Sequence, residues 1–329
     1  MIAACREGVA LIGIGAYVPE RVMTNDEIAT IVDTDDEWIS QRTGIHERRI
    51  AAPAESSATL GAEAAAAAVA SAGIDPGELD LIVAATASPD FYFPATASLI
   101  GDRIGATDAA GYDLSAACTG FIYALAQAYS QIASGLAETV LVVGTEVFSR
   151  LLDWTDRSTC ILFGDGAGAV VLRRDAGGGM RGFELGADGA GGMLLSVAAA
   201  GHAEVGDAGR FVQMNGPEVY KFATRVVVES SERCLAAAGL KVADVDVFVP
   251  HQANRRIIDH AVRRLGLDEQ RVVTNVDRYG NTSAGSIPIC LDEAWRAGRI
   301  HPGDVVLMVG FGGGLAWGSC VMEWTKEGP

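Results

Sequence analysis

AGIDPGELDLIV, residues 72–83, recurs 166 residues later as AGLKVADVDVFV, residues 238–249. Each stretch reads as the end of a helix with a glycine, an acidic turn, and a strand rich in β-branched residues. A second pair, ETVLVVG at residues 138–144 and DVVLMVG at residues 304–310, has the same offset and reads as a buried strand that ends in glycine. Two pairs in one register predict that the chain contains a duplicated structural unit.

A third pair, LFGDGAGAVV at residues 162–171 and GFGGGLAWGS at residues 310–319, matches at an offset of 148. On this alignment the first unit carries 18 additional residues after Glu146. We interpret residues 147–160 as an insertion and as a candidate functional loop.

Helical patterns separate the predicted strands. Apolar residues recur at spacings of three and four over residues 58–72, 120–134, 219–238 and 255–265. Strands that alternate with helices predict an α/β protein. We therefore expect two similar halves, residues 1–175 and 176–329, joined at Gly177-Gly178-Gly179 and packed as a pseudo-dimer within one chain, each half a mixed sheet flanked by helices.

Composition restricts the class of protein. Of the 329 residues, 49% are hydrophobic and 20% are charged, which excludes a disordered chain. The net charge of −17 argues against non-specific binding to nucleic acid or to an anionic membrane. The most apolar stretch, residues 64–70, is far shorter than the ~18 residues of a membrane span. The six cysteines form no CxxC pair and no signal-peptide pattern is present, so we expect free thiols in the cytoplasm.

The repeat also places chemical groups. The offset of 166 maps Cys118 onto Ala284, inside GNTSAGS at residues 280–286, so one half offers a thiol where the other offers the amide of Asn281. The same offset maps His251 onto Ala85, just beyond a predicted strand end. Ligands of α/β proteins bind at the carboxyl ends of strands, so these residues are candidates for one site.

Cys118 precedes an apolar helix that we expect to begin near Thr119. A helix N-terminus lowers the pKa of a thiol and favours the nucleophilic thiolate. Taken singly, Cys118 could equally be an inert buried cysteine, His251 a core histidine and Asn281 a turn residue. Their occurrence together favours a reactive site.

Two glycine-rich segments have different interpretations. GDGAGA, residues 164–169, is followed by a strand rather than a helix, which argues against dinucleotide binding. GFGGGLAWG, residues 310–318, follows a buried strand and allows backbone N–H groups to approach a bound oxygen, as in an oxyanion hole. A close crossing of two strands in the core would explain the same glycines.

Six blocks together resemble β-ketoacyl-acyl-carrier-protein synthase III of the thiolase-like superfamily. They are DTDDEWISQRTGIHERRI (33–50), SAACTGFIYAL around Cys118, FGDGAGA (163–169), HQAN (251–254), GNTSAGSIP (280–288) and GFGGGLAWGS (310–319). They occur in the family's order over nearly the whole chain. The resemblance implies a duplicated five-layer α/β/α/β/α fold, consistent with the repeat.

The resemblance also implies roles for individual residues. Cys118 is expected to accept the acyl group, His251 and Asn281 to bind the malonyl thioester carbonyl, and the amides of Cys118 and Gly313 to form the oxyanion hole. Coenzyme A would contact Trp38, Arg42, Arg157 and Asn254. The acyl pocket would comprise Phe148, Phe163, Met214 and Phe311, with Phe93 lent across the interface of a homodimer.

The implied reaction is a decarboxylative condensation of an acyl-CoA primer with malonyl-acyl carrier protein, without metal or redox cofactor. Because the carrier protein is acidic, we expect a basic docking patch at Lys221, Arg255 and Arg256. A degradative thiolase would need a second cysteine beside the C-terminal glycines, where Phe311 stands instead. A starter-unit ketosynthase or acyltransferase of a polyketide pathway shares these motifs, and an inactive scaffold is disfavoured by the retained Cys, His and Asn.

Overall fold

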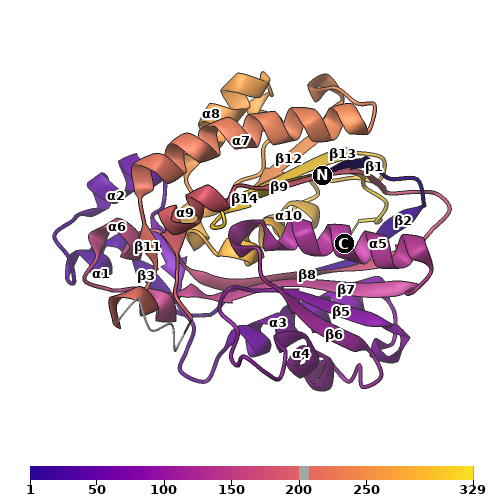
Figure 1. Ribbon diagram of the computed structural model, residues 1–329, viewed down its shortest axis with the longest axis horizontal. Coiled ribbons are helices and arrows are strands. Elements are labelled where there is room, and N and C mark those ends of the chain that lie inside the picture. The colour runs from indigo at the N-terminus through magenta and orange to yellow at the C-terminus, as the bar shows by residue number, and fades with distance from the viewer. Residues whose placement is uncertain (200–206, 329) are drawn as a thin grey trace.

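The computed structural model describes residues 1–199 and 207–328, and they form five stacked layers (Figure 1). Two five-stranded sheets are the second and fourth layers. One sheet has the order β2-β8-β7-β5-β6, comprising Val9–Tyr17, Asp165–Arg174, Thr139–Val147, Leu81–Ala85 and Ala110–Leu114. The other has the order β1-β9-β14-β13-β12, comprising Ile2–Ala4, Met180–Ala187, Ala316–Glu323, Val305–Gly312 and Val247–Pro250.

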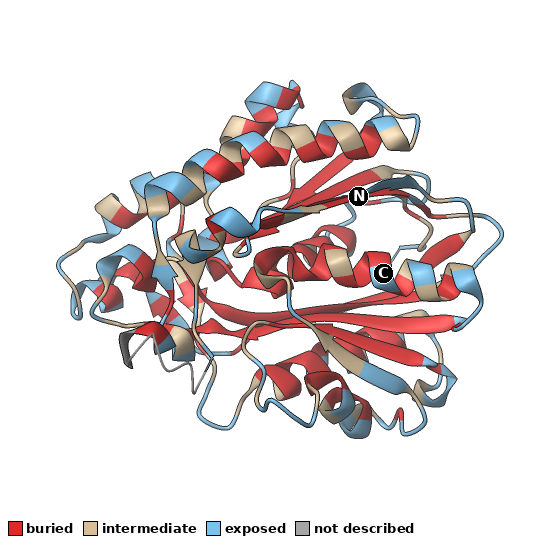
Figure 2. Cartoon of the chain, viewed as in Figure 1, coloured by how far each residue is buried: buried red, intermediate tan, exposed pale blue. Residues whose placement is uncertain are grey.

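Helices form the remaining layers. The buried pair α5 (Gly120–Ser134) and α10 (Ser286–Arg296) lies between the two sheets, where Figure 2 shows mostly buried residues. The outer face of the first sheet is covered by α3 (Ser57–Ala72) and α4 (Thr96–Ile104), and that of the second by α7 (Gly216–Ala237) and α8 (Arg255–Leu265). The predicted five-layer duplicated fold is therefore confirmed.

Local signals explain where the predicted helices begin and end. Ser56 caps α3 through a capping box, and Gly73 ends it in the left-handed conformation at φ 67°. Asn254 caps α8 by accepting from the N–H of Arg256, and Gly266 ends it at φ 69°. Three of the four predicted helices agree with the structure within one residue at each end, whereas α7 begins three residues earlier than expected, at Gly216.

Strand register corrects one part of the predicted repeat. Gly144 of β7 pairs with Gly168 of β8, and the equivalent Gly310 of β13 pairs with Gly318 of β14. Equivalent residues of β7 and β13 therefore differ by 166 in residue number, whereas equivalent residues of β8 and β14 differ by 150 rather than by the predicted 148. The motif alignment matched glycines that are not structurally equivalent, and the insertion after Glu146 is two residues shorter than expected.

The strands of the first sheet all lie between residues 9 and 174, and those of the second between 180 and 323, with one exception. The exception is β1, which pairs antiparallel with β9 and so adds the first residues of the chain to the second sheet. A division at residue 175 stays a prediction.

A lobe at one end of the molecule lies outside the layers, at the left of Figure 1. Four of its elements precede α3 in the sequence: β3 (Val22–Thr24), α1 (Asn25–Ala29), α2 (Asp36–Thr43) and β4 (Glu47–Arg49). The proposed insertion contributes α6 (Arg157–Cys160) and the 3-10 turn η3 (Phe148–Leu151). The short pair β10 (Leu195–Ser196) and β11 (Gln213–Met214) lies beside it.

Candidate active site

Two equivalent turns meet where the halves contact each other. They are η2 (Ala117–Thr119) before α5 and η8 (Ser283–Gly285) before α10, and each contains a non-glycine residue in the left-handed region, Ala117 at φ 46° and Ser283 at φ 48°. Each turn packs on a glycine in a strand of the opposite half. A Cβ on Gly310 would lie 3.0 Å from Thr119 Cα, and one on Gly144 would lie 2.2 Å from the carbonyl oxygen of Ala284.

The turns bring the three predicted reactive residues to one cavity. Cys118, His251 and Asn281 line a cavity of about 150 Å³. Cys118 also lines a second cavity of about 160 Å³, whose other lining residues include Ala87 and Val212. The thiol therefore lies at the boundary between the two cavities.

The environment of Cys118 differs from the expectation. The residue is 4% exposed and directly precedes α5, as predicted. Burial nevertheless raises the pKa of the Cys118 thiol to about 12, although hydrogen bonds to Ser283 and Asn281 oppose the shift. The predicted lowering of this pKa is wrong, because loss of hydration outweighs the helix N-terminus. The thiol is protonated at neutral pH.

His251 follows β12 at its carboxyl end, as the repeat predicted. Its N–H donates to the carbonyl of Val309, its Nδ1 lies 2.6 Å from Oγ of Ser286, and its ring meets Phe311 edge-on at 5.2 Å. Burial lowers the pKa of His251 to about 3, so the imidazole is neutral at neutral pH. When the Ser286 hydroxyl donates to Nδ1, the proton resides on Nε2, which can then donate to a bound oxygen.

Asn281 is fixed by its backbone and its side chain. Its backbone N–H donates to the carbonyl of Leu162, and its backbone carbonyl accepts from the N–H of Gly164. These two hydrogen bonds fix the residue against the first half. Its Oδ1 accepts from the N–H of Ser283 at 2.8 Å. That bond leaves Nδ2 as the donor that reaches Cys118, where it could stabilise a negatively charged oxygen bound beside the thiol.

The glycine-rich segment approaches the thiol closely. A Cβ on Gly312 would lie 2.8 Å from the backbone nitrogen of Cys118 and 3.3 Å from its Sγ, which leaves no room for a side chain. Gly313 lines the second cavity together with Cys118. A nucleophile beside backbone N–H groups, facing two neutral donors, can carry out acyl transfer and stabilise an enolate.

Comparison with known proteins decides the family. The family model of 3-oxoacyl-acyl-carrier-protein synthase III matches residues 112–189, and the model of that family's C-terminal region matches residues 235–324. The β-ketoacyl-acyl-carrier-protein synthase III of Desulfitobacterium hafniense is 52% identical over 327 residues, which are 97% of this chain and 99% of that protein. The chain belongs to the 3-oxoacyl-acyl-carrier-protein synthase III family.

Solved structures agree with this membership. The synthase III of Aquifex aeolicus superposes with a TM-score of 0.92 at 44% identity and covers 96% of this chain and 100% of its own. The priming β-ketosynthase of a polyketide biosynthetic pathway superposes with a TM-score of 0.93 at 39% identity, covering 98% of both chains. The synthase III family and the polyketide enzyme thus share one fold.

Most of the predicted acyl-pocket residues reach the two cavities of this synthase III family member. Phe148 and Phe163 stack with centroids 4.9 Å apart and line the second cavity. Phe163, Met214 and Phe311 line the first. Phe93 does neither, because its side chain is 86% exposed on the loop before α4.

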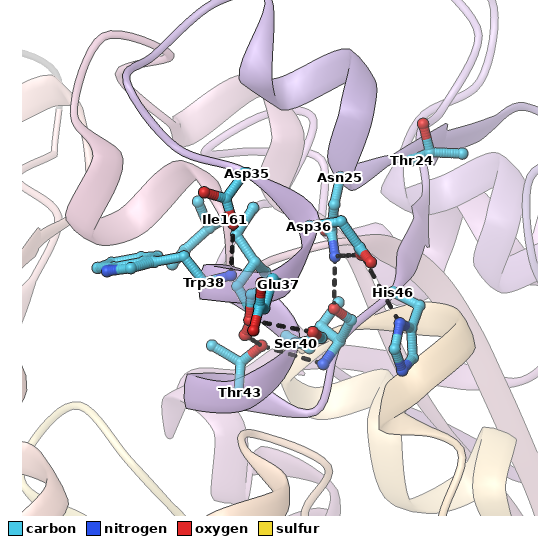
Figure 3. A network of polar contacts seen from close by, with 12 residues as sticks. Thr24, Asn25, Asp35, Asp36, Glu37, Trp38, Ser40, Thr43, His46 and Ile161 are labelled. Carbon is cyan, nitrogen blue, oxygen red and sulfur yellow. Dashed lines mark hydrogen bonds and ion pairs between the residues drawn. The ribbon is translucent and has the colours of Figure 1, made fainter.

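The predicted coenzyme A residues lie in or beside the lobe that is outside the five layers. The guanidinium carbons of Arg42 and Arg157 lie 4.5 and 4.7 Å from the centroid of Trp38. Figure 3 shows the indole pointing away from the polar network in which Asp35 caps α2 by accepting from the Trp38 N–H at 2.7 Å. Asn254 lines the first cavity and donates to the Arg42 carbonyl. Because Arg157 stacks on Trp38 directly, an adenine could enter between them only after the guanidinium moves.

The predicted docking residues lie at the starts of α7 and α8. Lys221, Arg255 and Arg256 are exposed, and the Arg256 guanidinium lies 5.4 Å from the ring of Tyr220, which lines the first cavity. Arg255 is partly neutralised by Asp259, whose Oδ1 is 2.6 Å from its Nε. Arg256 and Lys221 are therefore the stronger candidates.

Three residues at the site were not predicted: Glu146, Ser283 and Ser286. Ser283 and Ser286 lie within the GNTSAGS motif but received no role. Glu146 is the last residue but one in a strand of nine buried residues, at the position where the repeat places Gly312 in the other half. A charged residue at the end of a buried strand, opposite a glycine of the repeat, was the available signal.

Proposed function

We propose that this chain condenses an acyl-CoA primer with malonyl-acyl carrier protein, with loss of carbon dioxide, and so initiates fatty acid synthesis. The products are 3-oxoacyl-acyl carrier protein, coenzyme A and carbon dioxide. The observation that carries the proposal is that Cys118, His251 and Asn281, from three separate segments, line one cavity. Membership of the synthase III family supports the same activity.

In the first half-reaction the Cys118 sulfur attacks the thioester carbonyl of the primer, and coenzyme A leaves. The backbone N–H groups of Cys118 and Gly313 stabilise the oxyanion of the tetrahedral intermediate. The acyl chain occupies the cavity beside Phe148 and Phe163, while Met214 and Phe311 line the approach.

In the second half-reaction His251 and Asn281 donate to the malonyl thioester oxygen. Carbon dioxide departs, the resulting enolate is held by the two neutral donors, and its carbon attacks the acyl-Cys118 thioester. A neutral imidazole suits this task, because it can donate from Nε2 without first giving its proton to the substrate. The reaction balances without a metal or redox cofactor.

Recognition of the two thioesters is proposed at the outer lobe and at α7 and α8. Trp38, Arg42, Arg157 and Asn254 are suited to an adenine ring and to phosphates, because guanidinium groups pair with phosphate and stack on aromatic faces. Lys221, Arg255 and Arg256 would attract an acidic carrier protein, against the net charge of −17.

A homodimer is proposed because β6 is an edge strand and lies near an exposed aromatic loop. Phe91 is 57% and Phe93 86% exposed, and an edge strand offers unpaired backbone groups to a second copy. In the dimer Phe93 would reach the partner's acyl pocket.

No helix in residues 1–199 and 207–328 is long and apolar enough to cross a membrane. We also propose a cytoplasmic location. We propose further that the chain divides into two halves near residue 175.

Intact-mass measurement after incubation with a panel of acyl-CoAs tests the activity. The protein should gain the mass of one acyl group, and addition of malonyl-acyl carrier protein should then remove that group and form 3-oxoacyl-acyl carrier protein. Cys118→Ala should gain nothing, whereas the control Cys160→Ala, altered at another buried thiol, should be acylated. An adduct on the Cys118→Ala protein would refute the assignment.

The relative from Desulfitobacterium hafniense, at 52% identity, carries the synthase III name, whereas the polyketide priming enzyme is 39% identical. A starter-unit role in a polyketide pathway is therefore the second candidate. The same mass experiment separates the two, because release of the acyl group to malonyl-acyl carrier protein of fatty acid synthesis is expected only for the first.

A further inference from the structure

Acyl transfer to Cys118 requires a proton acceptor that the predicted site does not supply. The thiol has a pKa raised to about 12 by burial, so it is protonated before the reaction. His251 is a poor acceptor, because burial also holds its imidazole neutral, with a pKa lowered to about 3. Some other group near the thiol must take the proton.

Glu146 is a carboxyl group inside the same site. It is 0% exposed and is the last residue but one of β7, which packs against η8, the turn that follows Asn281. Its oxygens accept from Thr86 Oγ1 at 3.2 Å, the Ala87 N–H at 3.1 Å and Ser88 Oγ at 2.5 Å. These donors stabilise the ionised form, whereas burial favours the neutral form and raises the pKa of Glu146 to about 7. The carboxyl is therefore poised to gain or lose a proton near neutral pH.

Ser283 connects this carboxyl to the thiol. Its hydroxyl donates to Oε1 of Glu146 at 3.0 Å, and the same side chain lies within hydrogen-bonding reach of the Cys118 sulfur. Because the one hydroxyl proton is directed to Glu146, the Ser283 oxygen is left to accept a proton from the thiol. Ser283 is fully buried and is held in the left-handed region at φ 48° by the turn that packs on Gly144. The thiol, the hydroxyl and the carboxyl thus lie next to one another in this order, across the contact between the halves.

We propose that Glu146, acting through the Ser283 hydroxyl, accepts the proton of Cys118 during acyl transfer and returns it when the condensation ends. This inference rests on the proposed function and assigns a role to a residue outside the Cys, His and Asn set. Glu146 touches no substrate, so it is a positioning and proton-holding residue.

The proton moves through Ser283 in both half-reactions. As the Cys118 sulfur bonds to the primer carbonyl carbon, its proton passes to the Ser283 oxygen, and the Ser283 proton passes to Glu146. Coenzyme A leaves as a thiolate, which takes a proton from water. When the enolate carbon later displaces the Cys118 sulfur, the thiolate recovers its proton from Ser283, which recovers its own from Glu146.

The charge of Glu146 and its role as proton acceptor have opposite effects on the reactivity of Cys118, so a substitution can distinguish them. An ionised Glu146 repels a thiolate at Cys118 and by charge alone raises the pKa of the thiol. If Glu146 acted only by charge, Glu146→Gln would lower the thiol pKa and make Cys118 more reactive. If Glu146 accepts the proton, the same substitution removes the acceptor and makes Cys118 less reactive.

The experiment measures alkylation of Cys118 by iodoacetamide as a function of pH, followed on the Cys118 peptide by mass spectrometry. In the unaltered enzyme the rate should rise through an inflection near pH 7, set by the coupled pair. Glu146→Gln should alkylate at least tenfold more slowly at pH 7 and lose that inflection. Ser283→Gly should behave alike, because glycine readily adopts the left-handed turn and lacks the hydroxyl together with its Cβ.

The matched control is Glu184→Gln, which alters a second buried carboxyl, 3% exposed, that pairs with Arg233 in the other half. Its alkylation profile should equal that of the unaltered enzyme. Faster alkylation in Glu146→Gln, or an unchanged inflection in Ser283→Gly, would overturn the proposal. Should Glu146→Gln fail to fold, Ser283→Gly decides alone. Alkylation needs no acyl-CoA, so failure of the proposed function would show separately as absence of an acyl adduct.

Discussion

The side chains around His251 determine what its imidazole can do. Ser286 contacts Nδ1 and Phe311 covers the ring, so the residue is buried, neutral and oriented. Asn281 reaches the same cavity with its amide fixed by the Ser283 N–H. Two neutral donors from different segments therefore face the position of a substrate oxygen.

His251→Ala and Asn281→Ala should each reduce condensation with malonyl-acyl carrier protein by roughly 10²- to 10³-fold, the usual effect of removing one donor to a developing oxyanion. Acylation of Cys118 by acyl-CoA should remain, because neither side chain is assigned to that half-reaction. Intact mass measures acylation, and release of carbon dioxide from labelled malonyl-acyl carrier protein measures the second step. Equal loss of both half-reactions in both variants would show that the division of roles is wrong.

Burial of His251 also predicts a pH dependence of stability. The unfolded histidine protonates near pH 6.5, whereas the folded one does so only near pH 3. Between these values the unfolded state binds more protons, so the free energy of unfolding should fall by roughly 1 kcal/mol per pH unit as the pH drops from 6.5. Urea unfolding at several pH values should show a shallower loss for His251→Asn. Comparison with that variant removes the opposing contribution of Glu146, whose folded pKa is raised.

At the scale of elements, the starts of α7 and α8 form a basic edge beside the first cavity. Arg256→Glu combined with Lys221→Glu should raise the KM for malonyl-acyl carrier protein about tenfold, with an effect that weakens at high salt. Acylation by acyl-CoA should change little. The control is Arg263→Glu with Arg264→Glu, exposed charges in the last turn of α8. Equal effects of the two double variants would place the docking surface elsewhere.

The 3-10 turn η3 narrows the second cavity through Phe148, which stacks on Phe163. Phe148→Leu should enlarge this cavity and shift the preference toward longer or branched primers, with kcat/KM for a five-carbon acyl-CoA rising about tenfold relative to acetyl-CoA, the usual scale for a change of one or two methylenes in an apolar pocket. Competition between the two thioesters, read as the ratio of acyl adducts by intact mass, measures the shift. An unchanged ratio would show that another wall limits the primer.

At the scale of the whole molecule, the turn of each half packs on a glycine in a strand of the other half. Gly144→Ala would place a methyl group 2.2 Å from the Ala284 carbonyl, and Gly310→Ala one 3.0 Å from Thr119 Cα. Each should lower stability by about 1–3 kcal/mol, because a well-packed contact must move apart. Gly144→Ala should impair mainly condensation, because it displaces the Asn281 turn, and Gly310→Ala mainly acylation. Thermal melts measure the loss of stability, and the two half-reaction assays measure acylation and condensation separately. If Gly144→Ala impaired mainly acylation and Gly310→Ala mainly condensation, the prediction would be wrong.

Much of this architecture could be predicted, because a duplicated fold leaves its period in the sequence. The offset placed the Cys118 motif and the GNTSAGS motif on equivalent turns, and the helices followed from apolar residues at spacings of three and four. The offset of β8 to β14 was wrong, because short glycine-rich motifs align in more than one register.

The remaining features depend on distance in space rather than on pattern. The raised pKa of Cys118 arises from desolvation by layers far apart in sequence. The partners of Glu146 lie 58 to 60 residues before it and 137 residues after it, so no local motif could reveal the network.

The meeting of two cavities at a single sulfur atom constrains the order of events in time. Cys118, Phe163 and Leu195 border both cavities, and once an acyl chain fills the second cavity, only the first remains for another thioester. The departing coenzyme A and the arriving malonyl-acyl carrier protein must therefore occupy the same space in succession. Released coenzyme A is expected to compete with the extender for the acylated form, so that accumulation of the first product slows the second half of the cycle.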